Sequence, residues 1–192
     1  MSQAAAAAPA QAVITYISQN YDISGALVGR QSASEGFLRA YMKHGGANPF
    51  VCLTTAAPEI DAFKKFIAEH APPGTRAEGF LPTEMMRLAA TGTLYRPGPD
   101  LAYFAWLRRG LGQRGFSIVG VNHTLSDEPA MAAIGRILLG PVQSWDALVC
   151  TSAASKAAIT RLLDEYTAYL AQLTGVELRP QPQLPVIPLG VD

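Results

Sequence analysis

The stretch FSIVGVNHTLSDEPAMAAIGRILL (residues 116–139) carries the pattern that decides the fold. Its first part, FSIVGV, is nearly continuously apolar and predicts a strand buried on both faces. The polar residues that follow predict a loop, and Ser126 is the expected N-cap of a helix. Met131, Ile134 and Leu138 then recur at helical spacing. The stretch therefore predicts a strand, a polar loop and an amphipathic helix.

The same alternation runs through the rest of the chain. Helical patterns separate further short apolar runs, namely VITYI (13–17), FVCL (50–53), AEGFL (77–81), TGTLY (91–95) and WDALVC (145–150). One of these helices is expected to begin at an N-cap, Ser32, and to end at Gly45. Apolar strands joined by helices imply parallel crossovers. The expected fold class is α/β, a doubly wound, Rossmann-like domain with a mostly parallel sheet of about seven strands and helices on both faces.

Composition bounds the domain organisation and the partners. The 192-residue chain has 15 basic and 15 acidic side chains, so its zero net charge argues against nucleic-acid binding. Residues 12–192 are expected to form one domain, whereas the Ala-rich residues 1–11, without a basic segment, are expected to be a disordered leader. No apolar run reaches about 18 residues, so no transmembrane segment is expected, and peripheral membrane contact stays open.

The two cysteines, Cys52 and Cys150, lie inside apolar runs. They are expected to be buried free thiols in a reducing compartment, which predicts a cytoplasmic protein. Neither a CxxC nor an HxxxH spacing occurs, so no metal site is expected.

The string GLGQRG (residues 110–115) matches the dinucleotide-binding pattern GxGxxG. A dinucleotide site requires that string between a strand and a helix, so that the pyrophosphate meets the helix N-terminus. Here the string follows a predicted helix and precedes a strand. We therefore interpret the glycines as a helix end and a turn.

Ligands of open parallel sheets bind beyond the carboxyl ends of the strands. The loop SQNYDISGALVGRQ after the first strand is longer than usual, and its SGALVGR part offers Gly25, Gly29 and Arg30. Glycines allow a close backbone approach, and an arginine binds a phosphate through two parallel hydrogen bonds. The alternative interpretation is an ordinary flexible loop.

A second loop, NHTLSDE, follows the strand of the opening stretch. Its candidate residues are Asn122, His123, Thr124 and Glu128. A lone histidine is more often structural than catalytic, and an acidic residue in a first helical turn also complements the helix dipole. Both interpretations therefore stay open for this loop.

Two more candidates end other strands. Ser152 precedes the longest predicted helix and is either a helix cap or a ligand contact. Arg96 follows the TGTLY strand and either meets an anion or is solvated.

In this order the motifs resemble the N-terminal domain of glycosyltransferase family 4, which has the GT-B fold. The pieces are SGALVGR, VGVNHTLS, DALVCTSAASK and the final VIPLGVD, and they cover residues 12–192. Two positions depart from the family pattern: Val28 precedes Gly29 where relatives have adjacent glycines, and Leu189 stands where many have Asn.

The resemblance implies the acceptor-binding half of a retaining glycosyltransferase, which moves a sugar from a nucleotide-sugar to an acceptor hydroxyl without a bound metal or other cofactor. His123 would contact the transferring sugar, Gly25 and Gly29 would face the donor diphosphate or the acceptor, and Ser152 would line the same cleft. The donor-binding C-terminal domain would be missing. The chain is thus expected to be a fragment or a half-enzyme, inactive alone.

Two alternatives stay open beside this expectation. One is a different GT-B enzyme, such as a sugar-nucleotide epimerase. The other is a non-catalytic binding module that pairs with a separate C-terminal half through the apolar segment LPVIPLGVD (residues 184–192).

Overall fold

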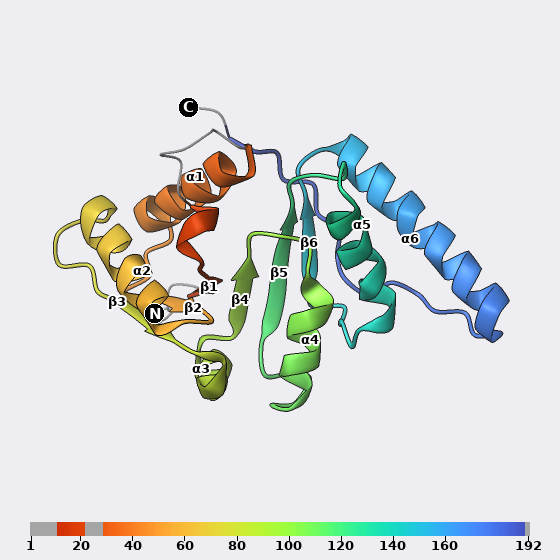
Figure 1. The fold of residues 1–192 in the computed structure, drawn as a ribbon, viewed down its shortest axis with the longest axis horizontal. Helices are drawn as coiled ribbons and strands as arrows, with labels where there is room; N and C mark the ends of the chain where they lie inside the picture. The colour runs from red at the N-terminus through yellow and green to blue at the C-terminus, as the bar shows by residue number, and fades with distance from the viewer. Residues whose placement is uncertain (1–10, 22–28, 191–192) are drawn as a thin grey trace, which may run out of the picture. The chain divides into compact units, whose positions relative to one another are not determined.

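The computed structural model of the chain describes residues 11–21 and 29–190 (Figure 1). The chain divides into two compact units, residues 1–84 and residues 85–192. The predicted leader lies outside the described residues except for Gln11. The prediction of one domain over residues 12–192 stays a prediction.

The first unit holds three parallel strands in the order β3-β2-β1. Helix α2 packs against β2 and β3, and α1 contacts α2. The elements are β1 (Val13–Thr15), the 3₁₀ turn η1 (Ser18–Asn20), α1 (Gly29–His44), β2 (Phe50–Leu53), α2 (Ala57–His70), β3 (Ala77–Phe80) and the 3₁₀ turn η2 (Pro82–Glu84).

The second unit repeats this plan with three parallel strands in the order β4-β5-β6. Helix α4 packs on β5, α6 packs on β6, and α5 contacts both α4 and α6. The elements are α3 (Met86–Thr91), β4 (Thr93–Arg96), α4 (Leu101–Arg109), β5 (Ser117–Asn122), α5 (Glu128–Gly135), the 3₁₀ turn η3 (Arg136–Leu139), β6 (Ala147–Cys150) and α6 (Ala153–Thr174).

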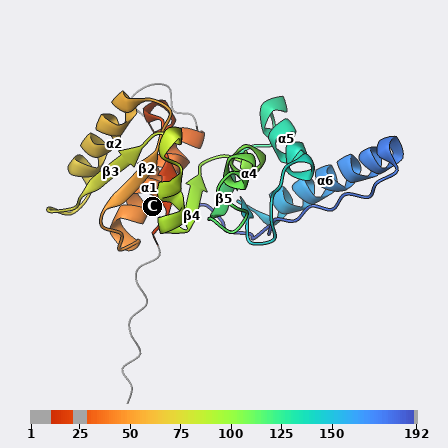
Figure 2. The same ribbon diagram turned by 90° about the horizontal axis from the view of Figure 1, so that it is seen from below.

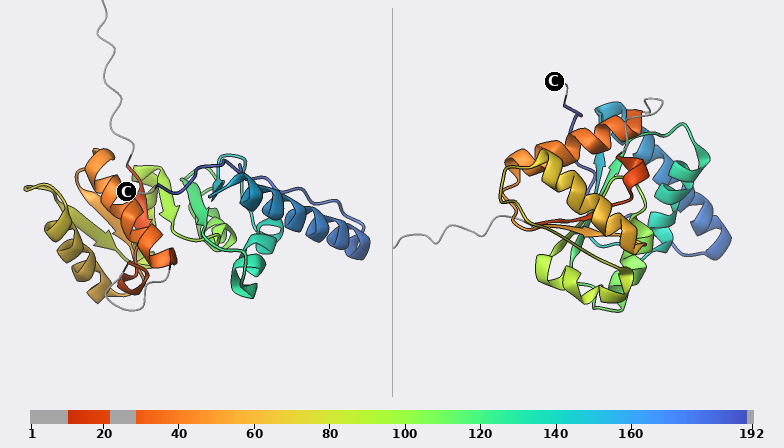
Figure 3. Two further views of the ribbon diagram at one scale, coloured as in Figure 1. Left: turned by 90° about the horizontal axis from the view of Figure 1, so that it is seen from above. Right: turned by 60° about the vertical axis from the view of Figure 1, so that its left-hand side comes forward.

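The predicted α/β class is confirmed, because every described strand pairing is parallel and helices flank the strands. The described residues contain six strands rather than about seven. The expected last strand is replaced by an extended segment that pairs with β6 through isolated parallel bridges, Ala147 with Gln183 and Cys150 with Val186. Figures 2 and 3 show this segment running back along α6 after Gly175.

Each unit buries the apolar strand residues that the sequence pattern indicated. Both cysteines are buried and free, as predicted.

No helix of the described residues is long and apolar enough to cross a membrane. The fully buried core of the second unit includes Leu88, Leu94, Leu101, Ile118, Ile134, Leu148 and Ile159.

A buried ion pair connects helix α4 to the amino ends of β5 and β6. Arg108 and Asp146 are both 0 % exposed, and the two guanidinium Nη atoms donate to the two carboxylate oxygens at 2.6 and 2.8 Å. Arg108 also donates to the Phe116 carbonyl at 2.9 Å, and Asp146 accepts from the Ile118 amide at 2.9 Å. The pair therefore fixes where β5 starts relative to α4 and to the loop before β6.

Strands β1 and β6 are each two residues shorter than predicted. Three further predicted boundaries were wrong. Helix α1 begins at Gly29, so Ser32 lies inside it; Arg and Gln are good helix formers, and they extend the helix upstream of the capping-box serine. Residues 91–92 end helix α3 instead of starting a strand, because Gly92 adopts a left-handed φ of 77°.

The third error concerns the start of α5. Asp127 rather than Ser126 caps this helix, and its carboxylate accepts from the Ala130 amide at 2.8 Å. The Ser126 hydroxyl instead lies 2.7 Å from Thr124 Oγ1. A carboxylate also interacts favourably with the positive end of the helix dipole, which gives Asp127 the advantage.

Candidate functional site

The candidate site lies at the carboxyl ends of β4, β5 and β6 in the second unit. The register places Arg96 opposite Gly120 and Asn122 opposite Cys150. Strand β5 therefore extends two residues beyond the end of β4, from Gly120 to Asn122. The chain leaves this edge through the loops that lead into α5 and α6, and the first turn of α6 contacts Asn122 through Ser155.

Asn122 is the best-defined polar residue of this edge. It is 2 % exposed, and its Nδ2 donates to Ser155 Oγ in the first turn of α6 at 2.9 Å. Its Oδ1 is buried and accepts no hydrogen bond from any described residue. An unsatisfied buried acceptor costs about 1–3 kcal/mol, which makes this oxygen the most unusual polar atom of the edge.

Ser152 performs the structural role that the sequence left open. It is the N-cap of α6, and its hydroxyl accepts from the Ser155 amide at 3.0 Å. Ser155 thus connects Ser152 to Asn122, since it donates its amide to one residue and receives the side-chain amide of the other. The structure brings Asn122 and Ser152 together through a residue that the sequence analysis did not select.

The other polar residues of the NHTLSDE loop make their contacts within the loop or with the first turn of α5. Thr124 Oγ1 accepts from the Ser126 amide at 3.1 Å. Glu128 is exposed in the first turn of α5, where a negative charge complements the helix dipole. This position agrees with the helix-dipole interpretation, and a role of Glu128 in ligand binding stays a prediction.

His123 immediately follows β5 and is half-buried. Both ring nitrogens are out of contact with solvent. Its chain neighbour Asn122 is the residue that contacts the first turn of α6. The histidine therefore lies at the predicted edge of the sheet, and its role stays a prediction.

Arg96 ends β4 but turns toward α4. Its guanidinium carbon lies 5.9 Å from the centre of the Phe104 ring, and its Nε is buried without a hydrogen-bond partner in the described part of the chain. The loop after β4 folds tightly over β5, because the Val121 amide donates to the Gly98 carbonyl at 3.2 Å. Arg96 is therefore partly packed rather than simply solvated.

The first-unit candidates are only partly described. Gly25 lies outside the described residues, and so does the Arg30 side chain. Gly29 is the first residue of α1 and is exposed, with open space where a Cβ would be. Gly29 belongs to the first unit and Asn122 to the second, so their expected sharing of one cleft stays a prediction.

Sequence analysis missed other polar groups at strand ends. The hydroxyl groups of Thr15, at the end of β1, and Thr54, just after β2, are buried without a hydrogen-bond partner among the described residues. Ser155 could have been found from the spacing of Ser152 and Ser155, because a cap serine is followed three residues later by the amide it accepts.

Burial keeps two ionisable groups near this edge in their neutral form. Burial raises the pKa of the Cys150 thiol, and the nearby Lys156 lowers it by less. Burial also raises the pKa of the Tyr95 hydroxyl in β4. Both groups stay protonated and neutral at neutral pH. Among the residues described, no cluster of three or more His, Cys, Asp or Glu side chains could hold a metal ion.

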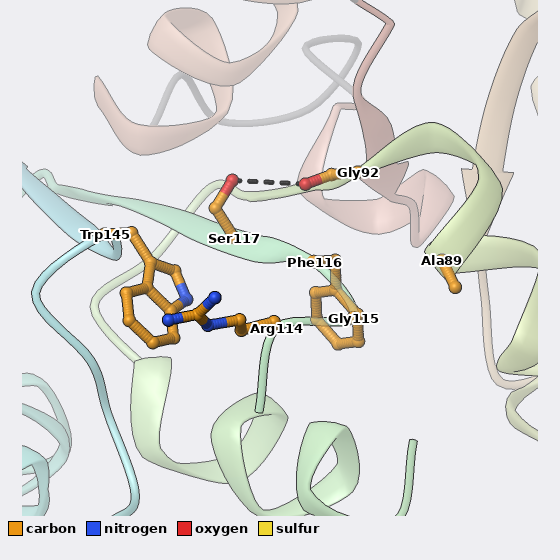
Figure 4. A pocket seen from close by; sticks show the side chains of 7 residues that line it. All are labelled: Ala89, Gly92, Arg114, Gly115, Phe116, Ser117 and Trp145. Carbon is orange, nitrogen blue, oxygen red and sulfur yellow. Dashed lines mark hydrogen bonds between the residues drawn. The ribbon is translucent and has the colours of Figure 1, made fainter. Parts of the chain in front are cut away.

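A separate cavity of about 430 Å³ opens at the opposite, amino ends of β4 and β5. It contains none of the residues selected from the sequence. Its lining comprises Ala89, Gly92, Arg114, Gly115, Phe116, Ser117 and Trp145 (Figure 4).

Comparisons of the chain with protein-family models, curated proteins and solved structures found no match.

Proposed function

We propose that the chain is the acceptor-binding half of a retaining glycosyltransferase that moves a sugar from a nucleotide-sugar to an acceptor hydroxyl. The proposal rests on the ordered motifs of the sequence and on the polar edge at the carboxyl ends of β5 and β6. The observation that supports it most is the buried, unsatisfied Oδ1 of Asn122. A sugar presents many hydroxyl donors, and one of them would satisfy this acceptor.

In this proposal each residue at the carboxyl ends of these strands makes a different contact with the substrate. Asn122 accepts a sugar hydroxyl while Ser155 holds its amide group in place. His123 contacts the transferring sugar through its ring or its backbone carbonyl. The free amide groups at the start of α6 lie on the same side and favour a negatively charged or hydroxyl-rich group.

A separate C-terminal domain of the GT-B type is the proposed partner, because it would supply most of the contacts to the nucleotide-sugar. Around the carboxyl ends of these strands the basic side chains Arg96 and Lys156 are offset by the acidic side chains Asp127 and Glu128, so no basic cluster forms there. A leaving diphosphate would therefore lack its main electrostatic stabilisers in this chain alone. We expect the chain by itself to bind sugars and to transfer them poorly. A sugar-nucleotide epimerase of the same architecture would use the same edge.

A non-catalytic binding module is the second candidate, and one observation favours it. Val186, Ile187 and Leu189 are 40 %, 55 % and 52 % exposed in the segment that pairs with β6. Apolar side chains gathered in this way commonly mark a protein interface. In this candidate the segment docks a separately encoded domain.

Saturation-transfer difference NMR on the unaltered chain, without a partner domain, tests the proposal. The probes are UDP-glucose, GDP-mannose, free glucose and free mannose. We expect a difference signal from the sugar protons of at least one probe, and a much weaker signal with Asn122→Ala. The matched control is Asn48→Ala, which removes an exposed asparagine in the first unit together with its bond from the Arg76 amide at 3.1 Å.

Two results would count against sugar binding at this edge: no signal from any probe, or an equal signal from Asn122→Ala and the unaltered chain. Incubation with UDP-N-acetylglucosamine and no acceptor separates the alternatives further. Conversion of that compound to its epimer favours the epimerase over the transferase.

A further inference from the structure

The cavity at the amino ends of β4 and β5 combines an aromatic wall with one cationic side chain. Trp145, in the loop before β6, is 38 % exposed, and Phe116 is almost fully buried beneath the cavity. Arg114 is exposed and comes from the GLGQRG string between α4 and β5. Figure 4 shows the Arg114 side chain directed toward the Trp145 indole. The volume of about 430 Å³ falls in the range of small-molecule sites, ~300–1,000 Å³.

The hydrogen-bonding groups of the opposite wall are already paired. Ser117 Oγ donates to the Gly92 carbonyl at 3.2 Å and lies 3.2 Å from Thr93 Oγ1. The Gly92 carbonyl also accepts the Ser117 amide at 2.9 Å. Polar recognition in the cavity therefore depends on the guanidinium group of Arg114 and the indole N–H of Trp145. The guanidinium group forms no ion pair in the described part of the second unit.

The elements around the cavity hold it in a fixed shape. The left-handed Gly92 ends α3 at one side, and the buried Arg108–Asp146 pair fixes Phe116 and the loop before β6 at the other. A Cβ on Gly115 would lie 3.2 Å from the Gly112 carbonyl, so the turn that carries Arg114 is tight. A rigid ligand therefore meets preformed walls, and the exposed Arg114 side chain becomes ordered on binding.

We propose that this cavity binds a small, planar aromatic carboxylate. The aromatic ring stacks on the exposed Trp145 indole, which offers a large flat apolar face. The carboxylate pairs with Arg114, whose planar guanidinium matches two carboxylate oxygens at once. The site is at the opposite end of the strands from Asn122 and does not depend on the proposed sugar chemistry.

The experiment uses the indole N–H signal of Trp145 in a ¹H–¹⁵N spectrum. The chain has two tryptophans, so Trp106→Phe leaves Trp145 as the only indole reporter. The probes are 2-naphthoate and its neutral amide, 2-naphthamide, titrated separately. We expect naphthoate to shift the Trp145 signal saturably, and the dissociation constant for naphthamide to be about tenfold higher, because a charged hydrogen-bond partner is lost.

Arg114→Gln in the same background tests the charged contact, and it should raise the dissociation constant for naphthoate about tenfold. The matched control is Arg161→Gln, which removes the same charge from the exposed face of α6 and should leave the constant unchanged. Arg114 is exposed, so the variant is expected to fold, and the rest of its spectrum reports this directly. Equal affinity for the acid and the amide, or no saturable shift with either probe, would overturn the proposal.

Discussion

The side-chain amide of Asn122 donates to Ser155 Oγ across 2.9 Å and ties the carboxyl end of β5 to the first turn of α6. Ser155 in turn donates its backbone amide to the cap residue Ser152. The bond to Ser155 uses one of the two N–H groups of the Asn122 amide, whereas the buried Oδ1 accepts no hydrogen bond from a described residue. The relationship between strand and helix therefore places an acceptor where ligands of parallel sheets bind.

Ser155→Ala should lower the free energy of unfolding by about 1–3 kcal/mol, because it leaves the buried Asn122 amide group without an acceptor. The double variant with Asn122→Ala should cost less than the sum of the two single variants. Urea unfolding measures all three values. Thr160→Ala, an exposed change on the same helix, should stay within about 0.5 kcal/mol of the unaltered chain. Strict additivity would show that the bond contributes nothing.

Arg108→Met should destabilise the fold by about 3–5 kcal/mol, since the Asp146 charge would remain buried without its partner. Denaturant unfolding followed by circular dichroism gives the free energy. The control is Arg161→Met, which breaks an exposed ion pair with Glu165 and should cost less than about 1 kcal/mol. Similar losses in the two variants would contradict the role of the buried pair.

Gly120→Ala should destabilise the second unit by about 1–3 kcal/mol through overpacking. Its Cβ would lie 2.7 Å from the Gly98 carbonyl and 2.7 Å from the Leu101 side chain. The same change at Gly36, an exposed helix position with open space around the Cβ, should stabilise the chain by about 0.5–1 kcal/mol. Thermal unfolding of both variants compares the signs. A neutral Gly120→Ala would mean that the loop after β4 moves easily.

Alkaline pH should destabilise the first unit through Tyr16. Burial, aided by Glu59 and Cys52, raises the pKa of its hydroxyl to about 12 from 10.0. The folded state holds the proton more tightly, so this contribution is complete below about pH 10 and is lost as the pH rises through 12. Unfolding measured between pH 9 and 12 should show this loss, and Tyr16→Phe should reduce it. An unchanged slope in Tyr16→Phe would assign the loss to other groups.

The sequence predicted the strands well, because their signal is local. The runs containing Val51, Ile118 and Leu148 are apolar over the whole strand, and a strand buried on both faces needs just that composition. Boundaries were less predictable. Asp127 and Ser126 are both good cap residues, and which one caps depends on the hydroxyl contact between Ser126 and Thr124.

Long-range polar pairs were invisible in the sequence. Arg108 closes a helix and Asp146 precedes a strand, so each has the pattern of a solvated charge, yet both are fully buried. The site shows the same limit. Asn122 and Ser152 were predicted from their positions after strands, whereas the link through Ser155 requires the packing of α6 on β6. The amino-end cavity brings together Arg114 and Trp145, which no spacing rule connects.

Chemical-shift mapping by ¹H–¹⁵N NMR tests the central claim most directly, because it locates bound sugar by residue. The chain is titrated with UDP-glucose, GDP-mannose and their free sugars at millimolar concentration. The account predicts that at least one of them shifts the Asn122 side-chain amide and the backbone amides of His123, Thr124 and Ser155, and that the Trp145 indole signal stays in place. Shifts confined to other parts of the chain, or no shifts with any of these sugars, would contradict it.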